Sequence, residues 1–358
     1  MRFSYRRYRE GDAQAINALY FAVTGRIRTI EQYAWQWLQS PAGESEIWLI
    51  EAELDDGSTR LIGHHGVMAE EFCYRGNPIR VGKTENTMVL PEFRDKILYP
   101  RFEKAFLKQY EGNFHALFST TGPAPAIRLR EAMGYKFNQE WKPLYFGKEP
   151  RLSASLMLDR LLPRKTLTLT QMLSSAAPSC IDGTQTQVLK PNDPTFDFDD
   201  FWAKAAPAYG VTPKRTRANL NWRFWSNPYH THITVKLHST ERGTCICFVS
   251  ARNGRCLFVN DVFTDKPENT PYFLGQLSNW VRRVSGVACL RSHTTTENHQ
   301  LFSGRKNIQT PWVQSIVNMV RRQNTPGKMP RKITPQGQDF GLNDASDWYV
   351  TPFYFEGR

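Results

Sequence analysis

The segment whose residues could do chemistry lies between positions 87 and 100, where a predicted strand gives way to a predicted helix. A strand-to-helix turn aims several free backbone N–H groups at one point, and the positive end of the helix dipole adds to their potential. Such a turn can bind a pyrophosphate group. Arg94 and Lys96 lie inside the segment and would add cationic donors. The sequence therefore predicts an anion site at residues 94–99.

The elements that must position this segment follow from turn residues and hydrophobic periodicity. A short strand comes first, then a helix that Asp12 would cap, then an aromatic helix that ends before Pro41. Turn chemistry predicts an antiparallel meander that leads into the segment. The strand-like runs of the meander are 47–52, 60–74 and 79–90. After the segment we expect a helix, a strand, a second helix and a strand at 135–146.

This layout restarts in the second half of the chain. Residues 35–41, WQWLQSP, are echoed by residues 222–228, WRFWSNP. Each copy ends an aromatic-rich helix and is followed by three strand-like runs, a helix and a further strand. The shared order of elements favours a tandem duplication over a chance echo. The predicted domains are 1–149 and 185–358, joined by a connector at 150–184.

Composition and charge narrow the class of protein. The chain has 358 residues, of which 40% are hydrophobic and 22% charged, a balance typical of folded domains. The 46 basic and 34 acidic residues give a net charge of +12. Such a chain attracts polyanions, including nucleic acid, an acidic carrier protein or a phosphate-rich cofactor. The basic residues are scattered rather than gathered in a block, which disfavours a nucleic-acid binder.

Other sequence features exclude a membrane span and disfavour a metal. No stretch approaches about 18 uncharged apolar residues, the length that a membrane helix needs. The first residues are charged and lack the apolar block of a secretory signal, so a cytoplasmic protein is expected. The cysteines do not have the spacing of zinc ligands, and no metal is expected. Cys245 and Cys247 lie two apart in a predicted strand, where their thiols would point the same way.

The segment at 87–100 resembles the acyl-CoA signature of the GCN5-related N-acetyltransferase (GNAT) superfamily. In that signature a strand ending in Val-x-Pro-x-(Tyr/Phe)-Arg leads into an Arg-x-x-Gly-x-(Gly/Ala) turn and a helix. Val89, Pro91, Phe93 and Arg94 match it, and the order of elements matches over residues 3–146. The resemblance implies an α/β fold of the α+β type. It would have two tandem GNAT-like domains, each a mixed, mostly antiparallel sheet flanked by helices.

The chain departs from the family pattern at two glycines and one tyrosine. Asp95 and Ile97 stand where the family has glycines, so a negative charge and a side chain would lie near the pyrophosphate. Arg130 stands where the family has its usual acid, a tyrosine. The second copy has no phosphate-loop signature after Val262, so a cofactor is expected in the first domain alone.

The resemblance implies direct transfer of an acyl group from a CoA thioester to an amine, which must be neutral to attack. A carboxylate base helps to deprotonate it. Glu85 is the candidate base, because it lies on the strand that enters the signature and shares a face with Thr87 and Val89. The alternative is an ordinary strand glutamate. Tyr135 is a candidate acid, as is Tyr145, and both would suit a core equally.

The remaining site predictions follow the same resemblance. The residues expected to bind acyl-CoA are Met88, Val89, Leu90, Arg94, Asp95, Lys96, Ile97, Leu98 and Tyr99. Those expected near the acceptor are His64, His65, Asn86 and Ser119. Only one of the two adjacent histidines can face a cleft, because neighbours on a strand point to opposite faces. A purely structural histidine is the alternative for each.

Two functions stay open. The first is an acyl-CoA-dependent N-acyltransferase that modifies a small amine, such as an amino sugar or an amino-acid-like compound. Its acyl donor would be acetyl-CoA, a longer acyl-CoA or an acyl carrier protein. The second is a catalytically inactive GNAT-like binding module, which the missing glycines and the missing tyrosine favour.

Overall fold

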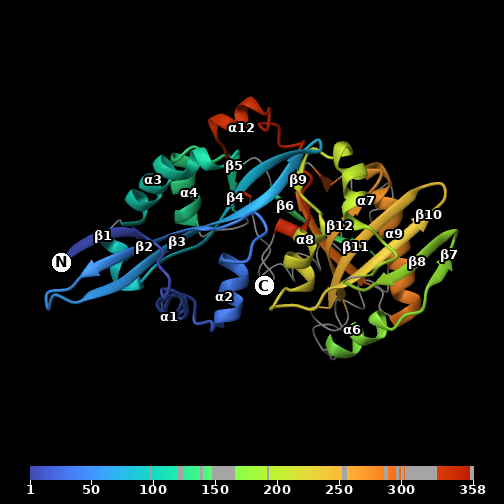
Figure 1. Cartoon of the computed structure of the whole chain (residues 1–358), viewed down its shortest axis with the longest axis horizontal. Helices are drawn as coiled ribbons and strands as arrows, with labels where there is room; N and C mark the ends of the chain where they lie inside the picture. Colours follow the sequence, from blue (N-terminus) through green and yellow to red (C-terminus); the bar gives the residue numbers. More distant parts are fainter. Residues whose placement is uncertain are drawn as a thin grey trace. The chain divides into compact units, whose positions relative to one another are not determined.

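The computed structural model describes most of the chain as two compact units (Figure 1). The described residues are 1–96, 98–119, 124–137, 140–146, 166–191, 193–251, 256–285, 289–295, 298–299, 302 and 329–354. The first unit comprises 1–73, 78–138 and 329–344, and the second comprises 74–77, 139–328 and 345–358. Each unit is built around one sheet.

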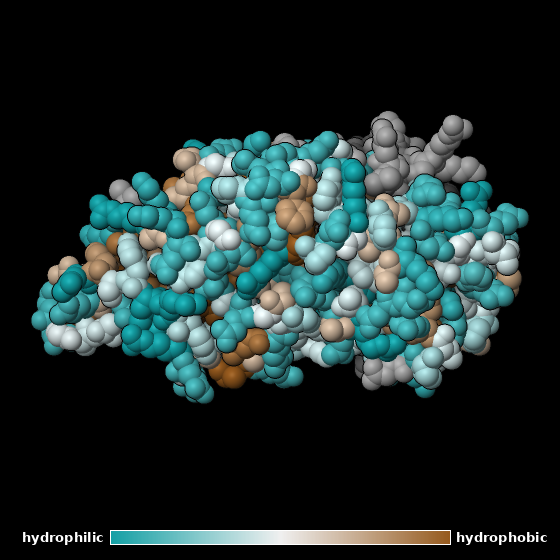
Figure 2. Space-filling view, turned by 45° about the horizontal axis from the view of Figure 1, so that its top comes forward, coloured by the Kyte–Doolittle hydropathy of each residue, from teal (hydrophilic) through white to brown (hydrophobic). Residues whose placement is uncertain are grey.

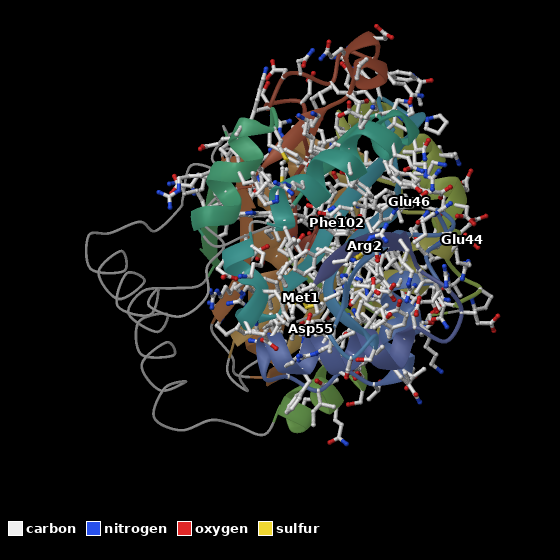
Figure 3. The ribbon with its side chains drawn as sticks, turned by 90° about the vertical axis from the view of Figure 1, so that its left-hand side faces the viewer. Met1, Arg2, Glu44, Glu46, Asp55 and Phe102 are labelled. Carbon is white, nitrogen blue, oxygen red and sulfur yellow. The ribbon has the colours of Figure 1, made fainter. Side chains whose placement is uncertain are left out.

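The sheet of the first unit has the order β1-β2-β3-β4-β5-β14. Its strands are β1 (Arg2–Arg7), β2 (Glu46–Glu53), β3 (Thr59–Tyr74), β4 (Asn77–Val89), β5 (Ala116–Phe118) and β14 (Arg331–Ile333). β1, β2 and β3 pair antiparallel, β4 and β5 pair parallel, and β14 pairs antiparallel with β5. At the outer edge the Met1 ammonium lies 3.5 Å from Asp55 Oδ1 (Figure 3).

Helices cover both faces of the first sheet (Figure 1). On one face lie α3 (Leu98–Tyr110) and α4 (Ala124–Ala132), and on the other lie α1 (Ala13–Thr24) and α2 (Ile30–Trp37). Phe102 and Phe106 of α3 pack against Trp48 of β2, with ring centroids 6.0 and 6.1 Å apart. The four-residue spacing of these phenylalanines places them on one helix face, and that is the face the helix buries.

The helix α2 is held closely against β3. It begins at a capping box, in which Thr29 Oγ1 accepts from the Gln32 N–H at 3.1 Å and Gln32 Oε1 accepts from the Thr29 N–H at 3.0 Å. At its other end Trp37 lies against Gly66, where an added Cβ would collide with the indole ring. A glycine at position 66 is therefore needed for this helix to approach the sheet.

Contrary to the prediction from the sequence, Asp12 does not cap α1 through its side chain. Asp12 stands at the N-cap position, but its side chain makes no hydrogen bond to the helix. Instead its two carboxylate oxygens accept from the Arg6 guanidinium at 2.7 and 2.9 Å. The carboxylate also accepts from the Arg9 N–H at 2.7 Å, so its hydrogen bonds go to residues that precede the helix.

The sheet of the second unit has the order β6-β13-β12-β11-β10-β8-β7. Its strands are β6 (Trp141–Phe146), β7 (Ser179–Ile181), β8 (Thr184–Leu189), β10 (Ile233–Ser239), β11 (Gly243–Ala251), β12 (Cys256–Thr264) and β13 (Cys289–Thr295). The helices of this unit include α6 (Thr166–Ser174), α7 (Phe198–Ala205), α8 (Arg217–Leu220) and α9 (Thr270–Ser285). Cys245 and Cys247 lie on one face of β11 with their Sγ atoms 3.6 Å apart, as strand alternation predicted.

The two sheets repeat one arrangement of strands. In the first, α3 connects β4 to a parallel β5, and in the second, α9 connects β12 to a parallel β13. Beside β5 lies the antiparallel β14, and beside β13 lies the antiparallel β6. The predicted fold class, with two mixed sheets flanked by helices, is confirmed.

The units are not consecutive stretches of chain, whereas the predicted domains were. β6 follows the first unit in sequence but belongs to the second sheet, and β14 follows the second sheet but belongs to the first. The edge strand of a sheet can pair with any strand through its free N–H and C=O groups. The order of strands in the sequence therefore does not reveal that β6 joins the second sheet and β14 the first. The echoed aromatic segments also differ locally, since 30–37 is α-helical and 221–225 is a π-helical turn.

Hydrophilic residues cover most of the face seen in Figure 2. None of the helices in the described ranges has the length and apolar character that crossing a membrane requires. Within the same ranges, no three His, Cys, Asp or Glu side chains are grouped so as to hold a metal ion.

Candidate active site

The parallel ladder between β4 and β5 ends in the middle of β4. Its last pair joins Lys83 to Phe118, and β4 continues to Val89. Asn86, in this continuation, has a left-handed backbone conformation with φ of 49°. Regular strands do not contain this conformation, and asparagine adopts it more readily than most residues. The strand is therefore irregular just beyond the point where its pairing with β5 ends.

A buried ion pair lies at this point. The Lys83 side chain is 0% exposed, and its Nζ lies 3.1 Å from Oε1 of Glu85, which is 17% exposed. Residues two apart on a strand share a face, so the pair forms within β4 itself. Burying an ammonium group is costly unless it is paired. Glu85, the candidate base, is therefore a carboxylate that a buried lysine holds in place.

A second polar cluster connects β3 and β4 to α3. His65 Nδ1 lies 2.9 Å from Thr87 Oγ1, and its Nε2 lies 3.3 Å from Glu103 Oε2. Tyr99 donates to the same carboxylate oxygen at 2.8 Å. Burial lowers the pKa of His65, although the nearby Glu103 opposes that shift. His65 and Glu103 are fully buried, so the cluster fixes α3 against the strand that carries Glu85.

Arg130 of α4 brings a positive charge to the same region. It is 4% exposed, and its burial opposes the charge, but Glu103 and Glu85 are among the neighbours that raise the pKa of its guanidinium overall. Its Cζ lies 6.0 Å from the ring centroid of Tyr135. Burial raises the pKa of Tyr135 well above its usual value, so that phenol keeps its proton. Position 130, where the sequence resemblance implies a tyrosine, thus holds a cation with a phenol beside it.

The two adjacent histidines face opposite sides of the sheet. His65 faces α3, whereas the ring of His64 lies against Trp37 of α2, with centroids 5.4 Å apart. Nδ1 of His64 donates to the Asn86 carbonyl oxygen at 2.8 Å, which holds the left-handed residue in place. Burial lowers the pKa of His64 to about 3, so the ring is neutral near pH 7.

Part of the predicted acyl-CoA segment forms a 3-10 helix, η1 (Pro91–Lys96), and its last residues, Leu98 and Tyr99, belong to α3. Arg94 Nε donates to the Val89 carbonyl oxygen at 3.1 Å, and the arginine is exposed. Lys96 Nζ lies 3.0 Å from Asp95 Oδ2, with the lysine side chain 50% exposed and the aspartate 67%. The negative charge of Asp95, where the sequence resemblance implies a glycine, is thus already paired with a neighbouring cation.

Three other residues of this segment belong to the hydrophobic core. Met88, Leu90 and Leu98 are buried there, and Val89 packs against it. The Leu90 N–H donates to the Ile62 carbonyl oxygen at 2.9 Å. A ligand at this segment would therefore meet backbone and charged groups rather than these apolar side chains.

Of the two remaining predicted site residues, Ser119 lies apart from these clusters, and Ile97 is not among the residues that the structure describes. Ser119 is 3% exposed, and its N–H donates to the Pro330 carbonyl oxygen at 3.0 Å, which ties the end of β5 to the segment before β14.

Sequence reasoning missed Lys83 and Glu103. Lys83 precedes Glu85 by two positions on the same strand, which placed it on the same face. Glu103 follows Tyr99 by four positions on α3, a spacing that allows the hydrogen bond observed between them. Both signals were present, but neither indicates that a charged side chain is buried.

Solved structures that resemble this chain include N-acetyltransferases related to GCN5. One, from Anabaena variabilis, is 12% identical over 93% of this chain and 73% of its own, with a TM-score of 0.56. Another, from Kribbella flavida, is 8% identical over 92% and 70% of the two chains, with a TM-score of 0.55. The chain therefore has the GNAT fold that its strand-to-helix motif predicted.

The fold is also similar to that of Saccharomyces cerevisiae N-myristoyltransferase, solved with bound myristoyl-CoA and inhibitors. That enzyme is 10% identical over 94% of this chain and 83% of its own, with a TM-score of 0.50. Comparison with protein-family models and with curated proteins finds no match.

Proposed function

We propose that this chain is an N-acyltransferase that moves an acyl group from a CoA thioester to the amine of an acceptor. The observation that carries the proposal is the end of the β4–β5 ladder at Lys83 and Phe118, with Glu85 and the irregular Asn86 just beyond it. Strand backbone next to such a break can bond to an extended ligand as it would to a further strand. The pantetheine arm of CoA carries amides suited to that pairing.

The donor would continue from this break to η1 and the start of α3. Its pyrophosphate would lie at residues 94–99, with Arg94 and Lys96 as cationic partners. Acetyl-CoA and longer acyl-CoAs are both proposed donors, since a similar fold is solved with myristoyl-CoA. An acidic acyl carrier protein is a third donor that the net charge of +12 favours.

The proposed chemistry combines Glu85 and its partner Lys83 with Arg130 and Tyr135. The carboxylate takes a proton from the acceptor ammonium, and the neutral nitrogen then forms a bond to the thioester carbonyl carbon as the C–S bond breaks. The departing thiolate takes a proton from Tyr135, the proposed donor, and the phenolate then takes the second proton that the acylated nitrogen must lose. Arg130 beside the phenol ring would stabilise the phenolate that forms. Lys83 keeps Glu85 oriented through the ion pair.

The proposed acceptor is a small amine, such as an amino sugar or an amino-acid-like compound. It would approach as an ammonium ion, which the Glu85 carboxylate attracts. His64 and His65 shape the site by holding Asn86 and Thr87 rather than by touching the acceptor. A cytoplasmic location stays part of the proposal.

Two measurements test the proposal. Calorimetric titration with CoA, acetyl-CoA and myristoyl-CoA should give saturable binding, and mass spectrometry of the protein with acyl-CoA and a pool of amines should reveal an acylated amine. Binding without transfer to any amine would favour the inactive binding module, which the replaced glycine at Asp95 and tyrosine at Arg130 also favour. Absence of binding to all three CoA compounds would reject a CoA donor and would leave an acyl carrier protein as the donor to test.

A further inference from the structure

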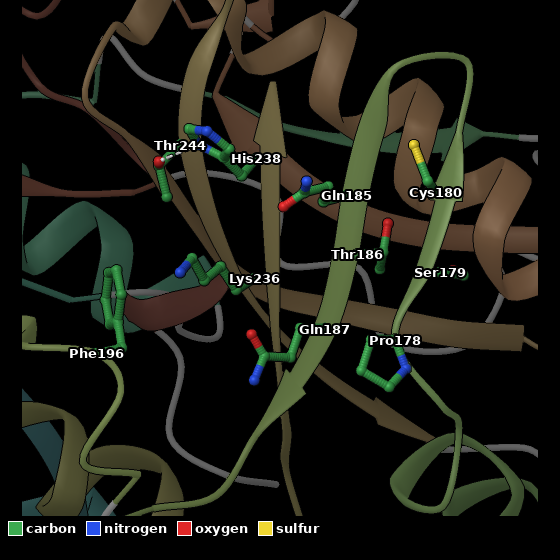
Figure 4. A pocket seen from close by; sticks show the side chains of 10 residues that line it. All are labelled: Pro178, Ser179, Cys180, Gln185, Thr186, Gln187, Phe196, Lys236, His238 and Thr244. Atoms are coloured by element: carbon green, nitrogen blue, oxygen red, sulfur yellow. Dashed lines mark hydrogen bonds between the residues drawn. The ribbon is translucent and has the colours of Figure 1, made fainter. Parts of the chain in front are cut away.

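A polar cavity of about 510 Å³ lies on the sheet of the second unit, in a region where no function has been proposed (Figure 4). Its lining comes from β7, β8, β10 and β11 and from Pro178 and Phe196. The volume falls in the range typical of small-molecule sites. The pairing of the strands shows which side chains of the lining lie next to one another.

Two rows of polar side chains cross the strands. In one row Cys180 of β7 pairs with Gln185 of β8, Gln185 pairs with His238 of β10, and His238 pairs with Thr244 of β11. In the next row Gln187 of β8 pairs with Lys236 of β10. Residues opposite one another on neighbouring strands share a face, so donors from separate strands converge on one cavity.

Two cationic or protonatable groups are held in position within these rows. Lys236 Nζ lies 5.0 Å from the ring centroid of Phe196, and its side chain extends toward that ring (Figure 4). His238 Nδ1 lies 2.9 Å from Thr244 Oγ1 (Figure 4). Because Nδ1 makes this contact, Nε2 is the ring nitrogen that would contact a ligand. Both groups are therefore preorganised on the cavity wall.

The chemistry of the lining selects an anion. It offers an ammonium, an imidazole, two primary amides and hydroxyl groups, and none of its described residues is acidic. A phosphate group, with several charged oxygens, can accept from more of these donors at once than a carboxylate can. Phe196 adds an apolar surface for the organic part of such a ligand.

We propose that this cavity binds a small organic phosphate, with Lys236 as its principal charged contact and Gln185, Gln187 and His238 as hydrogen-bonding partners. The site is separate from the proposed acyl transfer and does not depend on it. All of its residues come from the second unit.

The test is calorimetric titration of the full chain with phenyl phosphate, with inorganic phosphate and benzoate as comparison ligands. Wild type should bind phenyl phosphate saturably and more tightly than either comparison ligand. Lys236→Met should weaken that binding about tenfold or more, the cost of losing a charged hydrogen bond. The matched control Lys266→Met removes an exposed lysine of the same unit and should leave the affinity unchanged.

A second variant and a second control keep the test decisive. Gln187→Ala retains Lys236 and should weaken binding by a smaller factor, even if Lys236→Met does not fold. Arg94→Ala with Lys96→Ala should leave phenyl phosphate binding intact, which separates this site from the proposed pyrophosphate site. Equal loss in Lys236→Met and Lys266→Met, or no saturable binding by wild type, would overturn the proposal. Tighter binding of benzoate than of phenyl phosphate would overturn the choice of phosphate.

Discussion

Lys83 Nζ and Glu85 Oε1 lie 3.1 Å apart on one strand, and the lysine is fully buried while the glutamate reaches solvent. The pair lies where the β4–β5 ladder ends. Its two partners are therefore unequal: within the described part of the chain the buried ammonium has Glu85 as its ion-pair partner, whereas the carboxylate also reaches solvent.

This asymmetry predicts unequal effects on stability. Glu85→Ala should cost about 3–5 kcal/mol in the free energy of unfolding, because it leaves a buried ammonium unpaired. Lys83→Met should cost less, about 1–3 kcal/mol, because Glu85 can be hydrated once its partner is gone. Chemical denaturation of both variants checks the order. A larger loss in Lys83→Met would show that the lysine does not depend on Glu85.

A kinetic prediction concerns Glu85 as the base. Glu85→Gln keeps an oxygen that can accept from Lys83 but cannot take a proton, so turnover should fall about 10²–10⁴-fold while CoA affinity is retained. Raising the pH should partly restore turnover, because more of the amine is then neutral. Steady-state kinetics with the acceptor found by mass spectrometry gives both values. The control Glu92→Gln removes an exposed carboxylate near the same segment and should have no such effect. Near-normal turnover in Glu85→Gln would make Glu85 an ordinary strand residue.

The proposed pyrophosphate site predicts a loss of CoA affinity. Arg94→Ala combined with Lys96→Ala should weaken CoA binding by about 1–3 kcal/mol, since charged hydrogen bonds are lost. The matched control is Arg101→Ala with Lys104→Ala, which removes the same charge from exposed positions further along α3. Calorimetry should show a change in the first pair alone. Equal affinities in the two double variants would move the pyrophosphate elsewhere.

Acid should destabilise the fold through His64. Its pKa is lowered by burial to about 3, below the value of 6.5 expected for an exposed histidine. The unfolded chain therefore binds a proton between these values that the native chain excludes, so stability is fully present above about pH 6.5 and falls as the pH drops toward 3. By pH 5 the loss should reach about 2 kcal/mol, and the lowered pKa of His65 acts in the same direction.

The variant His64→Gln isolates this contribution, because its side chain does not titrate. Denaturation midpoints at pH 7 and pH 5 should differ less for His64→Gln than for wild type. Identical differences in the two proteins would show that His64 is not the source of the acid sensitivity.

Local signals in the amino-acid sequence predict much of the order of elements and the class of fold. Period-two runs, turn residues and the four-residue spacing of Phe102 and Phe106 are local signals, because strands and helices each impose one side-chain repeat. The motif around Val89 and Arg94 likewise depends on neighbours in the chain. These signals were sufficient to predict two mixed sheets flanked by helices, and the site residues stay a prediction.

Which strands complete each sheet, and which charges are buried, depends on contacts between distant parts of the chain. β14 joins β5 and β6 joins β13 through edge pairing between distant segments, and no local repeat encodes that choice. In the sequence, Lys83 and Glu103 look like ordinary solvent-exposed charged residues. Packing between elements buries both side chains. Likewise, the sequence predicts Asp12 as a helix cap, but in the structure its carboxylate accepts from Arg6 of β1. In each case the outcome depends on partners that folding brings together, because pairing and desolvation energies arise between elements rather than within them.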